Sequence, residues 1–163
     1  ISSFSVNDDD TYDVISSKMS QLGADLLREV LPSVFDGSCL RVKQDESLVT
    51  FAPVIRREDE RIDFSLTSLE VHNKIRGLSS IPGSYAFFEG APVKLFLSSL
   101  DECAETDLEP GVITRCSKDG LFVACGDREI KLVKFQFAGK KPVFVKDYLN
   151  GANKEELIGK KFM

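Results

Sequence analysis

The sequence predicts a mainly β fold with added α-helices: a small antiparallel β-barrel preceded by a linker and two helices. Three observations support this prediction. From residue 84 onward, short runs of β-branched and aromatic residues alternate with turns that contain glycine. Two earlier segments, 11–31 and 66–77, repeat apolar residues at helical spacing. Between them, residues 33–64 contain Pro53 and a mixed charge run, which is typical of a connecting segment.

The segment 11–31 is expected to form the first helix. Thr11 follows three aspartates and is a good N-cap, and these acidic residues suit the positive end of the helix dipole. Pro32 is expected to end the helix. One apolar stripe runs along it, at Ile15, Met19, Leu22, Leu26 and Val30. Nothing within the segment can cover this stripe, so we expect it to dock against another part of the protein.

The connecting segment and the second helix come next. Residues 33–64 are expected to cross a surface in short extended pieces rather than to form a core. Thr67 and Glu70 fit a capping box, and Gly77 suits the position after a helix end. The apolar stripe of this helix consists of Val71, Ile75 and Leu78. The opposite face carries Leu69, His72, Asn73 and Arg76. A short helix with these two faces is expected to bridge two bodies.

Five strands are expected after residue 84, followed by a short helix within residues 144–151. Glu89-Gly90-Ala91 and Lys118-Asp119-Gly120 supply turns between strands. In the fifth strand, Ile130 and Leu132 alternate in one phase, and Phe135 and Phe137 in the other. A bulge near Val133-Lys134 would bring both pairs onto one face. Five short antiparallel strands with a terminal helix predict an OB-like barrel or another small β-barrel.

Composition excludes membrane and fibrous classes. The 163 residues are 42% hydrophobic and 29% charged, and no apolar run approaches the ~20 residues of a membrane span. No signal peptide is recognisable, so a reducing cytoplasmic location is expected for the four cysteines. Their spacing, with a single histidine, favours buried thiols over a metal site. The sequence begins at Ile1 rather than at a methionine, which leaves open a fragment or a processed product.

Catalytic motifs are missing, and positive charge gathers in the last third of the chain. There is no phosphate-binding glycine loop, nucleophile elbow or metal-binding pair of histidines. Residues 111–163 carry 11 basic and six acidic side chains, whereas the whole chain has a net charge of −5. This asymmetry points to a polyanionic partner, with an ordinary solvated surface as the alternative. Candidate phosphate-binding residues are Lys94, Lys131, Lys134, Lys140 and Lys141.

Five segments in order resemble one enzyme family. They are QLGADLLREVLP (21–32), KQDESLVTFAPVIRREDERIDF (43–64), VHNKIRGLSSIPGSY (71–85), GAPVKLF (90–96) and AGKKPVFVKDYLNG (138–151). Their order and spacing are similar to those of methionyl-tRNA formyltransferase. Phe64 stands where that family usually has tryptophan, and Ile81-Pro82-Gly83 replaces its usual WPG or PPG. Both are apolar replacements that preserve packing.

The resemblance implies a division of the chain. Residues 1–36 would hold the last helix of a catalytic domain, 37–79 the linker and bridging helix, and 80–163 an OB-like C-terminal domain. The parent enzyme, a monomer, would use 10-formyltetrahydrofolate to formylate initiator methionyl-tRNA in translation initiation. The family's catalytic Asn, His and Asp do not fall within this sequence, so no catalytic residue is assigned, and His72 matches a non-catalytic histidine. The segment itself is expected to bind no cofactor or metal.

The same resemblance implies a nucleic-acid surface. Arg56 and Arg57 match a basic site in the linker, and Lys140-Lys141 match the family's GKK motif. Their expected role is to neutralise phosphates of the tRNA rather than to read bases. Related C-terminal domains occur in UDP-sugar formyltransferases and in 10-formyltetrahydrofolate dehydrogenase, which remain alternatives. A non-catalytic RNA-binding protein is a third interpretation.

Overall fold

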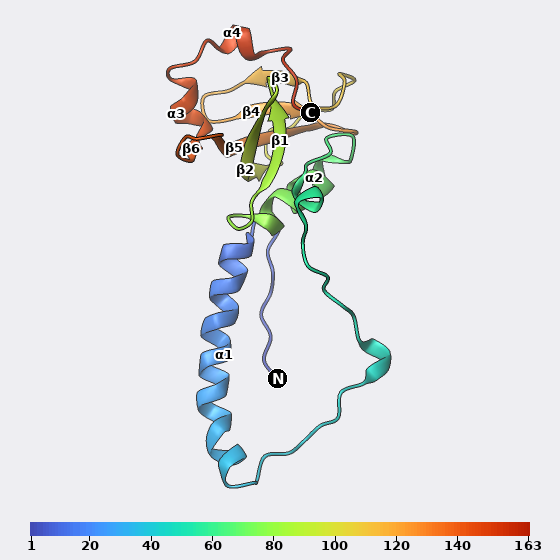
Figure 1. The fold of residues 1–163 in the computed structure, drawn as a ribbon, viewed down its shortest axis with the longest axis vertical. Coiled ribbons are helices and arrows are strands. Elements are labelled where there is room, and N and C mark those ends of the chain that lie inside the picture. Colours follow the sequence, from blue (N-terminus) through green and yellow to red (C-terminus); the bar gives the residue numbers. More distant parts are fainter.

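The computed structural model describes all residues, 1–163, and consists of a β domain with a long helical extension (Figure 1). The strands are β1 (Ser84–Phe88), β2 (Ala91–Ser99), β3 (Ile113–Cys116), β4 (Leu121–Ala124), β5 (Glu129–Phe137) and β6 (Val143–Phe144). The helices are α1 (Tyr12–Phe35), α2 (Ser68–Leu78), α3 (Val145–Leu149) and α4 (Lys154–Leu157), with 3-10 turns η1 (Glu46–Leu48) and η2 (Arg57–Glu60). The predicted class, an OB-like β domain preceded by a linker and two helices, is confirmed.

The six strands form one antiparallel sheet in the order β1-β2-β5-β4-β3, and β6 pairs with β5. Five strands were expected, and the sixth has two residues, too few for a periodic pattern. The predicted bulge is present: Leu97 faces Lys134 and Ser98 faces Leu132, so Val133 is the extra residue. Ile130, Leu132 and Phe135 are consequently all buried.

The turn between β1 and β2 is a tight hairpin, as predicted. Phe88 pairs with Ala91, which leaves a loop of Glu89 and Gly90. Both residues have positive φ, 51° and 79°, the backbone of a type I′ turn. The twist of this turn matches the twist of the strands, so the hairpin sets the register of β2 and places its apolar residues toward the core.

The C-terminal segment, residues 159–163, joins the two edges of the sheet. No other strand pairs with the outer sides of β1 and β3, so the sheet of the predicted OB-like domain is not closed by its strands alone. Met163 and Phe87 exchange two backbone hydrogen bonds, of 2.8 and 2.7 Å. On the other side, Phe162 N–H donates to the Gly111 carbonyl at 2.8 Å. The segment therefore satisfies backbone groups along both edges.

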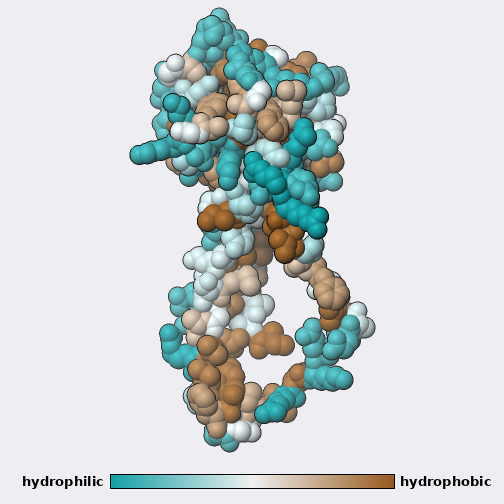
Figure 2. Space-filling model, viewed as in Figure 1, coloured by the Kyte–Doolittle hydropathy of each residue, from teal (hydrophilic) through white to brown (hydrophobic).

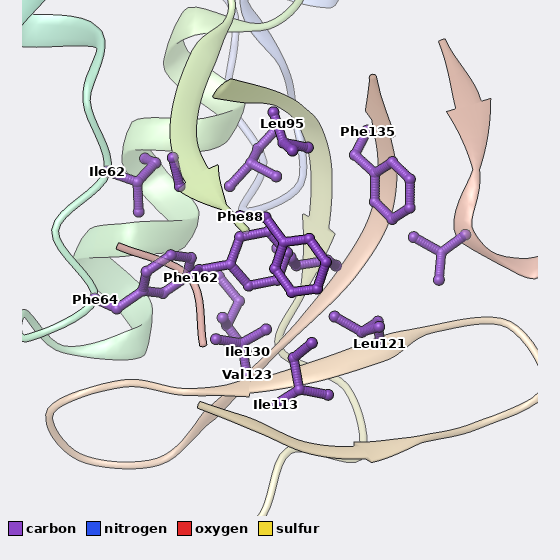
Figure 3. Packing of buried hydrophobic residues seen from close by; sticks show 14 of the residues in the cluster. Ile62, Phe64, Phe88, Leu95, Ile113, Leu121, Val123, Ile130, Phe135 and Phe162 are labelled. Carbon is purple, nitrogen blue, oxygen red and sulfur yellow. The ribbon is translucent and has the colours of Figure 1, made fainter. Parts of the chain in front are cut away.

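The core of the β domain is a cluster of 19 buried residues, several of which Figure 3 displays. The Phe162 ring lies 4.8 Å from the Phe88 ring and 5.9 Å from the Phe64 ring between centroids. Ile62 and Phe64 belong to this core, with 2% and 4% exposure, so the expectation that residues 33–64 form no core is wrong at their end. The cause is long-range: Ile62 N–H donates to the Tyr85 carbonyl at 2.8 Å and holds this segment against β1.

Helix α2 bridges the β domain and the N-terminal arm, residues 1–10, as expected. Thr67 and Glu70 form the predicted capping box, whereas Gly77 lies inside the helix, one residue before its end. Val71 and Ile75 are buried in the core. On the opposite face, His72 shares a 2.9 Å hydrogen bond with Ser98 Oγ and contacts the Asp8 carbonyl at 3.3 Å. Arg76 donates to the carbonyls of Asn7 and Asp10, at 3.2 and 3.0 Å.

Helix α1 extends away from the β domain, beside the arm formed by residues 1–10 (Figure 1). Pro32 does not end it: the helix continues to Phe35, and Asp36 N–H donates to the Pro32 carbonyl at 3.1 Å. Proline removes its own donor, but its carbonyl can still close the next turn. No residue of α1 is buried, and Met19 in the apolar stripe is 59% exposed. Figure 2 shows apolar residues gathered on this extension and on the linker.

Candidate nucleic-acid interface

The β5–β6 hairpin and the start of α3 carry a group of four lysines. We call Lys134, Lys140, Lys141 and Lys146 the lysine cluster. The loop that joins the two strands is closed locally, because Lys140 N–H donates to the Phe137 carbonyl at 3.0 Å. Gln136 Nε2 donates to the Lys140 carbonyl at 2.7 Å, and Gly139 adopts a positive φ of 73°. The resulting turn presents Lys140 and Lys141 to solvent.

Phe144 lies beside two members of the lysine cluster, Lys134 and Lys146. It pairs with Lys134 across the β5–β6 ladder and is 41% exposed. The Lys134 Nζ lies 5.3 Å from the centroid of the Phe144 ring, and the Lys146 Nζ lies 5.6 Å from it. These separations are within the range of a cation–π interaction. An exposed aromatic ring between positive groups has the elements of a site for a nucleic-acid strand.

The charges of the lysine cluster are not neutralised within the protein. None of the four ammonium groups has a carboxylate within 4.0 Å, although lysine and arginine side chains form ten ion pairs elsewhere in the molecule. Residues 130–146 contain five lysines and no acidic residue, so a carboxylate that pairs with one of them must come from outside this stretch. Glu129 and Asp147 are the acidic residues that flank this stretch along the chain. The cluster is therefore available to an external anion such as a phosphate.

Lys131 and Lys94 occupy different surroundings from the lysine cluster. Lys131 is 7% exposed, and its Nζ lies 3.1 Å from Asp119 and 3.4 Å from Glu102. Burial lowers the pKa of Lys131, but these two carboxylates outweigh the effect and hold it above the ordinary value. Lys94 is half-buried, and its Nζ donates to the Pro82 carbonyl at 2.6 Å. Both lysines thus already have internal partners.

Arg56 and Arg57 lie beside η2, on the side of the sheet that carries β1. The Arg57 guanidinium stacks over the Tyr85 ring at 3.8 Å and forms an ion pair with the partly buried Glu60. Arg56 is largely exposed, with a contact of 4.0 Å to Glu58. Strands β2 and β5 separate this edge from β6.

The structure therefore places three of the seven predicted residues, Lys134, Lys140 and Lys141, on one hairpin. Two residues that were not predicted, Lys146 and Phe144, belong to the same surface. The absence of acidic residues from 130–146 is the signal that points to Lys146.

Other surface features carry mixed charge. A cleft of about 690 Å³ lies between the end of the linker and the C-terminal segment, and Arg61, Asp63, Glu109 and Lys161 contribute to its wall. Lys161 forms an ion pair with Glu109 there, which leaves little net charge. No group of three or more His, Cys, Asp or Glu side chains is placed to hold a metal ion. None of the helices is both long and apolar enough to span a bilayer.

Comparison with solved structures identifies the same fold in a larger protein. Crystal structures of HypX from Aquifex aeolicus superpose with a TM-score of 0.67 at 16% identity, over 93% of this chain and 27% of HypX. A HypX structure in complex with tetrahydrofolic acid superposes with a TM-score of 0.58 at 18% identity, over 78% of this chain and 22% of HypX. At this level of identity the likeness concerns the fold alone.

Sequence comparison gives closer relatives. Methionyl-tRNA formyltransferase of Macrococcus caseolyticus is 42% identical over 153 residues, which cover 94% of this chain and 48% of that enzyme. The enzyme of Staphylococcus aureus strain MW2 is 40% identical, over 97% of this chain and 50% of its own length. The chain thus spans about half the length of the curated relatives. Residues 54–153 match the model described as formyl transferase, C-terminal domain. On this evidence the chain belongs to the formyl transferase C-terminal domain family.

Proposed function

We propose that this chain is the tRNA-binding part of a methionyl-tRNA formyltransferase. The observation that carries the proposal is the lysine cluster, four unpaired ammonium groups on one hairpin and the following helix. Lysines that meet phosphates gain affinity by releasing counterions, without any need for a fixed base sequence. The relatives that are 40–42% identical bear the name of an enzyme that acts on methionyl-tRNA, which supports the choice of RNA.

The parent protein would be a cytoplasmic transferase of one-carbon metabolism. It would move a formyl group from 10-formyltetrahydrofolate to the amino group of initiator methionyl-tRNA, and act as a monomer. We assign residues 1–36 to the last helix of its catalytic domain, 37–79 to the linker and bridging helix, and 80–163 to the OB-like domain. The exposed apolar residues of α1 and the linker support this division, because they would pack against that catalytic domain.

The segment supplies binding rather than chemistry in this proposal. Its one histidine, His72, is 3% exposed and already bonded to Ser98 Oγ and the Asp8 carbonyl. We expect the purified chain to transfer no formyl group when incubated with 10-formyltetrahydrofolate and methionyl-tRNA. Transfer above the background of a protein-free reaction would contradict this assignment.

The lysine cluster replaces the wider set of candidates as the main phosphate site. Lys140, Lys141 and Lys146 are exposed, and Lys134 is half-buried. Arg56 is retained as a secondary contact, because its side chain is 77% exposed. Arg57, Lys94 and Lys131 are assigned to internal contacts, where a phosphate would have to displace Glu60, Pro82 or Asp119.

A salt-dependent titration tests the proposal. The chain is titrated with initiator tRNA, with an elongator tRNA for comparison, at low and moderate salt. We expect the double variant Lys140→Ala/Lys141→Ala to weaken binding and to reduce the slope of log K against log salt by roughly 1–2, about one per lost phosphate contact.

The matched control is Lys118→Ala/Lys154→Ala, which removes the same charge from exposed positions in the β3–β4 turn and α4. It should leave the slope nearly unchanged. If both double variants reduced the salt slope equally, binding would depend on the overall net charge of the protein rather than on the lysine cluster. Absence of any salt-sensitive binding would instead favour a structural module, as in formyltransferases that act on a UDP-sugar or on folate.

A further inference from the structure

Phe144 is placed unlike the other exposed aromatic side chains of the molecule. Phe35 and Phe51 are 83% and 91% exposed and have no cation over their rings. Phe4 is 37% exposed and has one cation over its ring, Lys18 at 5.9 Å. Two lysine ammonium groups lie over the ring of Phe144. The only other ring with two cations over it, Phe122, is fully buried.

The outward position of Phe144 follows from the short strand β6. Side chains alternate along a strand, so Val143 is half-buried and packs against the core while Phe144 points to the surface. Lys134 lies opposite Phe144 on β5, and Lys146 follows it by two residues. Lys134 and Lys146 thus lie over an accessible aromatic ring, and the adjacent loop carries two more lysines, Lys140 and Lys141.

We propose that Phe144 is a stacking site for an unpaired nucleobase of an RNA strand whose phosphates contact the lysine cluster. This inference rests on the proposed function, and it adds a base contact to a surface otherwise described by charge alone. Every nucleobase has a π-face, so stacking on an aromatic side chain tolerates any sequence. On binding, the two flanking lysines turn from the ring to the phosphates on either side of the stacked base.

The ligand class follows from this geometry. Within a duplex, both faces of each base are covered by neighbouring base pairs, so stacking requires a base that is outside a helix. The site is therefore expected to prefer single-stranded RNA, such as a loop or an unpaired end, over duplex RNA. Loss of one stacked base should lower affinity roughly tenfold.

The absence of tryptophan from the chain gives a direct probe. In the variant Phe144→Trp, the introduced indole is the only tryptophan, and its fluorescence should be quenched when a base stacks on it. The titrant is a mixed-sequence oligoribonucleotide of about ten nucleotides, used as a single strand and as a duplex with its complement. The matched control is Phe51→Trp on the exposed linker, for which no quenching is expected.

A second measurement separates stacking from charge. Phe144→Ala should weaken binding of the end-labelled single strand roughly tenfold and leave the salt slope unchanged, whereas Phe144→Tyr should retain affinity. Unchanged urea unfolding of Phe144→Ala would show that the β domain is intact. Equal affinity of Phe144→Ala and the unchanged protein, or equal quenching by single strand and duplex, would overturn the stacking site and leave the lysine cluster standing. Absence of RNA binding by the unchanged protein at low salt would overturn both proposals.

Discussion

Replacing Phe162 by alanine tests whether the C-terminal segment is part of the core that holds the sheet edges together. The Phe162 side chain is 4% exposed, and its ring packs against Phe88 at 4.8 Å and Phe64 at 5.9 Å between centroids. Truncation of a buried phenylalanine to alanine costs about 3–5 kcal/mol. Because whole domains are stable by only about 5–15 kcal/mol, we expect Phe162→Ala to lose a large part of the stability.

Tyrosine fluorescence during urea unfolding measures this loss. Two of the three tyrosines, Tyr85 and Tyr148, lie in the β domain, and Tyr148 packs 5.2 Å from the Phe135 ring. The midpoint should fall while the dependence on urea stays the same. For a chain of this length, each kcal/mol corresponds to about 2–4 °C, so the melting temperature should fall by roughly 6–20 °C.

The neighbouring residue provides the control. Met163 is 56% exposed and makes backbone hydrogen bonds to Phe87 that a side-chain change preserves. Met163→Ala should alter the stability by no more than about 0.5 kcal/mol. A loss of less than about 1 kcal/mol for Phe162→Ala, or a loss no larger than that of Met163→Ala, would show that the segment does not belong to the core.

Three further predictions concern buried or bridging groups. Burial raises the pKa of Glu129, but hydrogen bonds from Arg115 and Thr114 outweigh it and hold the pKa below its ordinary 4.5. The ionised Glu129 therefore stabilises the fold at neutral pH, and this stabilisation is lost as the pH falls through the folded-state pKa. At neutral pH the urea midpoint of Glu129→Gln should lie below that of the unchanged protein, and in acid the two midpoints should converge. Burial raises the pKa of Cys125 to about 12, so iodoacetamide at about pH 8 should spare this thiol and alkylate the half-buried Cys39 first; early modification of Cys125 would contradict its burial. Arg76 binds the carbonyls of Asn7 and Asp10, so Arg76→Ala should speed amide hydrogen exchange in residues 7–10, whereas Lys74→Ala should not.

Local features of the fold could be predicted because they depend on residues close together in the chain. The capping box of Thr67 and Glu70, the tight turn at Glu89-Gly90 and the bulge at Val133 all form as expected. Each needs only a few neighbouring side chains or one special backbone angle. Helix ends were less accurate, since Pro32 and Gly77 disfavour a helix without forbidding one more turn.

Long-range pairing could not be predicted in the same way. Ile62 and Phe64 appear in a charged, connecting stretch, and only their position beside β1 makes them core residues. The last five residues have no strand pattern, yet they join β1 to Gly111 across the open side of the sheet. Such contacts form between segments separated by tens of residues, so no local period marks them.

The same contrast between local sequence features and long-range contacts applies to the candidate site. Charge and local spacing are properties of the chain, so the concentration of basic residues near the C-terminus is visible in the sequence alone. Which of these residues lack a carboxylate partner depends on the folded structure. Lys131 and Lys134 are three residues apart on β5, but Lys131 meets Asp119 and Glu102 from other segments, whereas Lys134 meets the ring of Phe144. Whether a lysine is available to an external phosphate depends on the carboxylates that folding brings to it, and those come from remote parts of the chain.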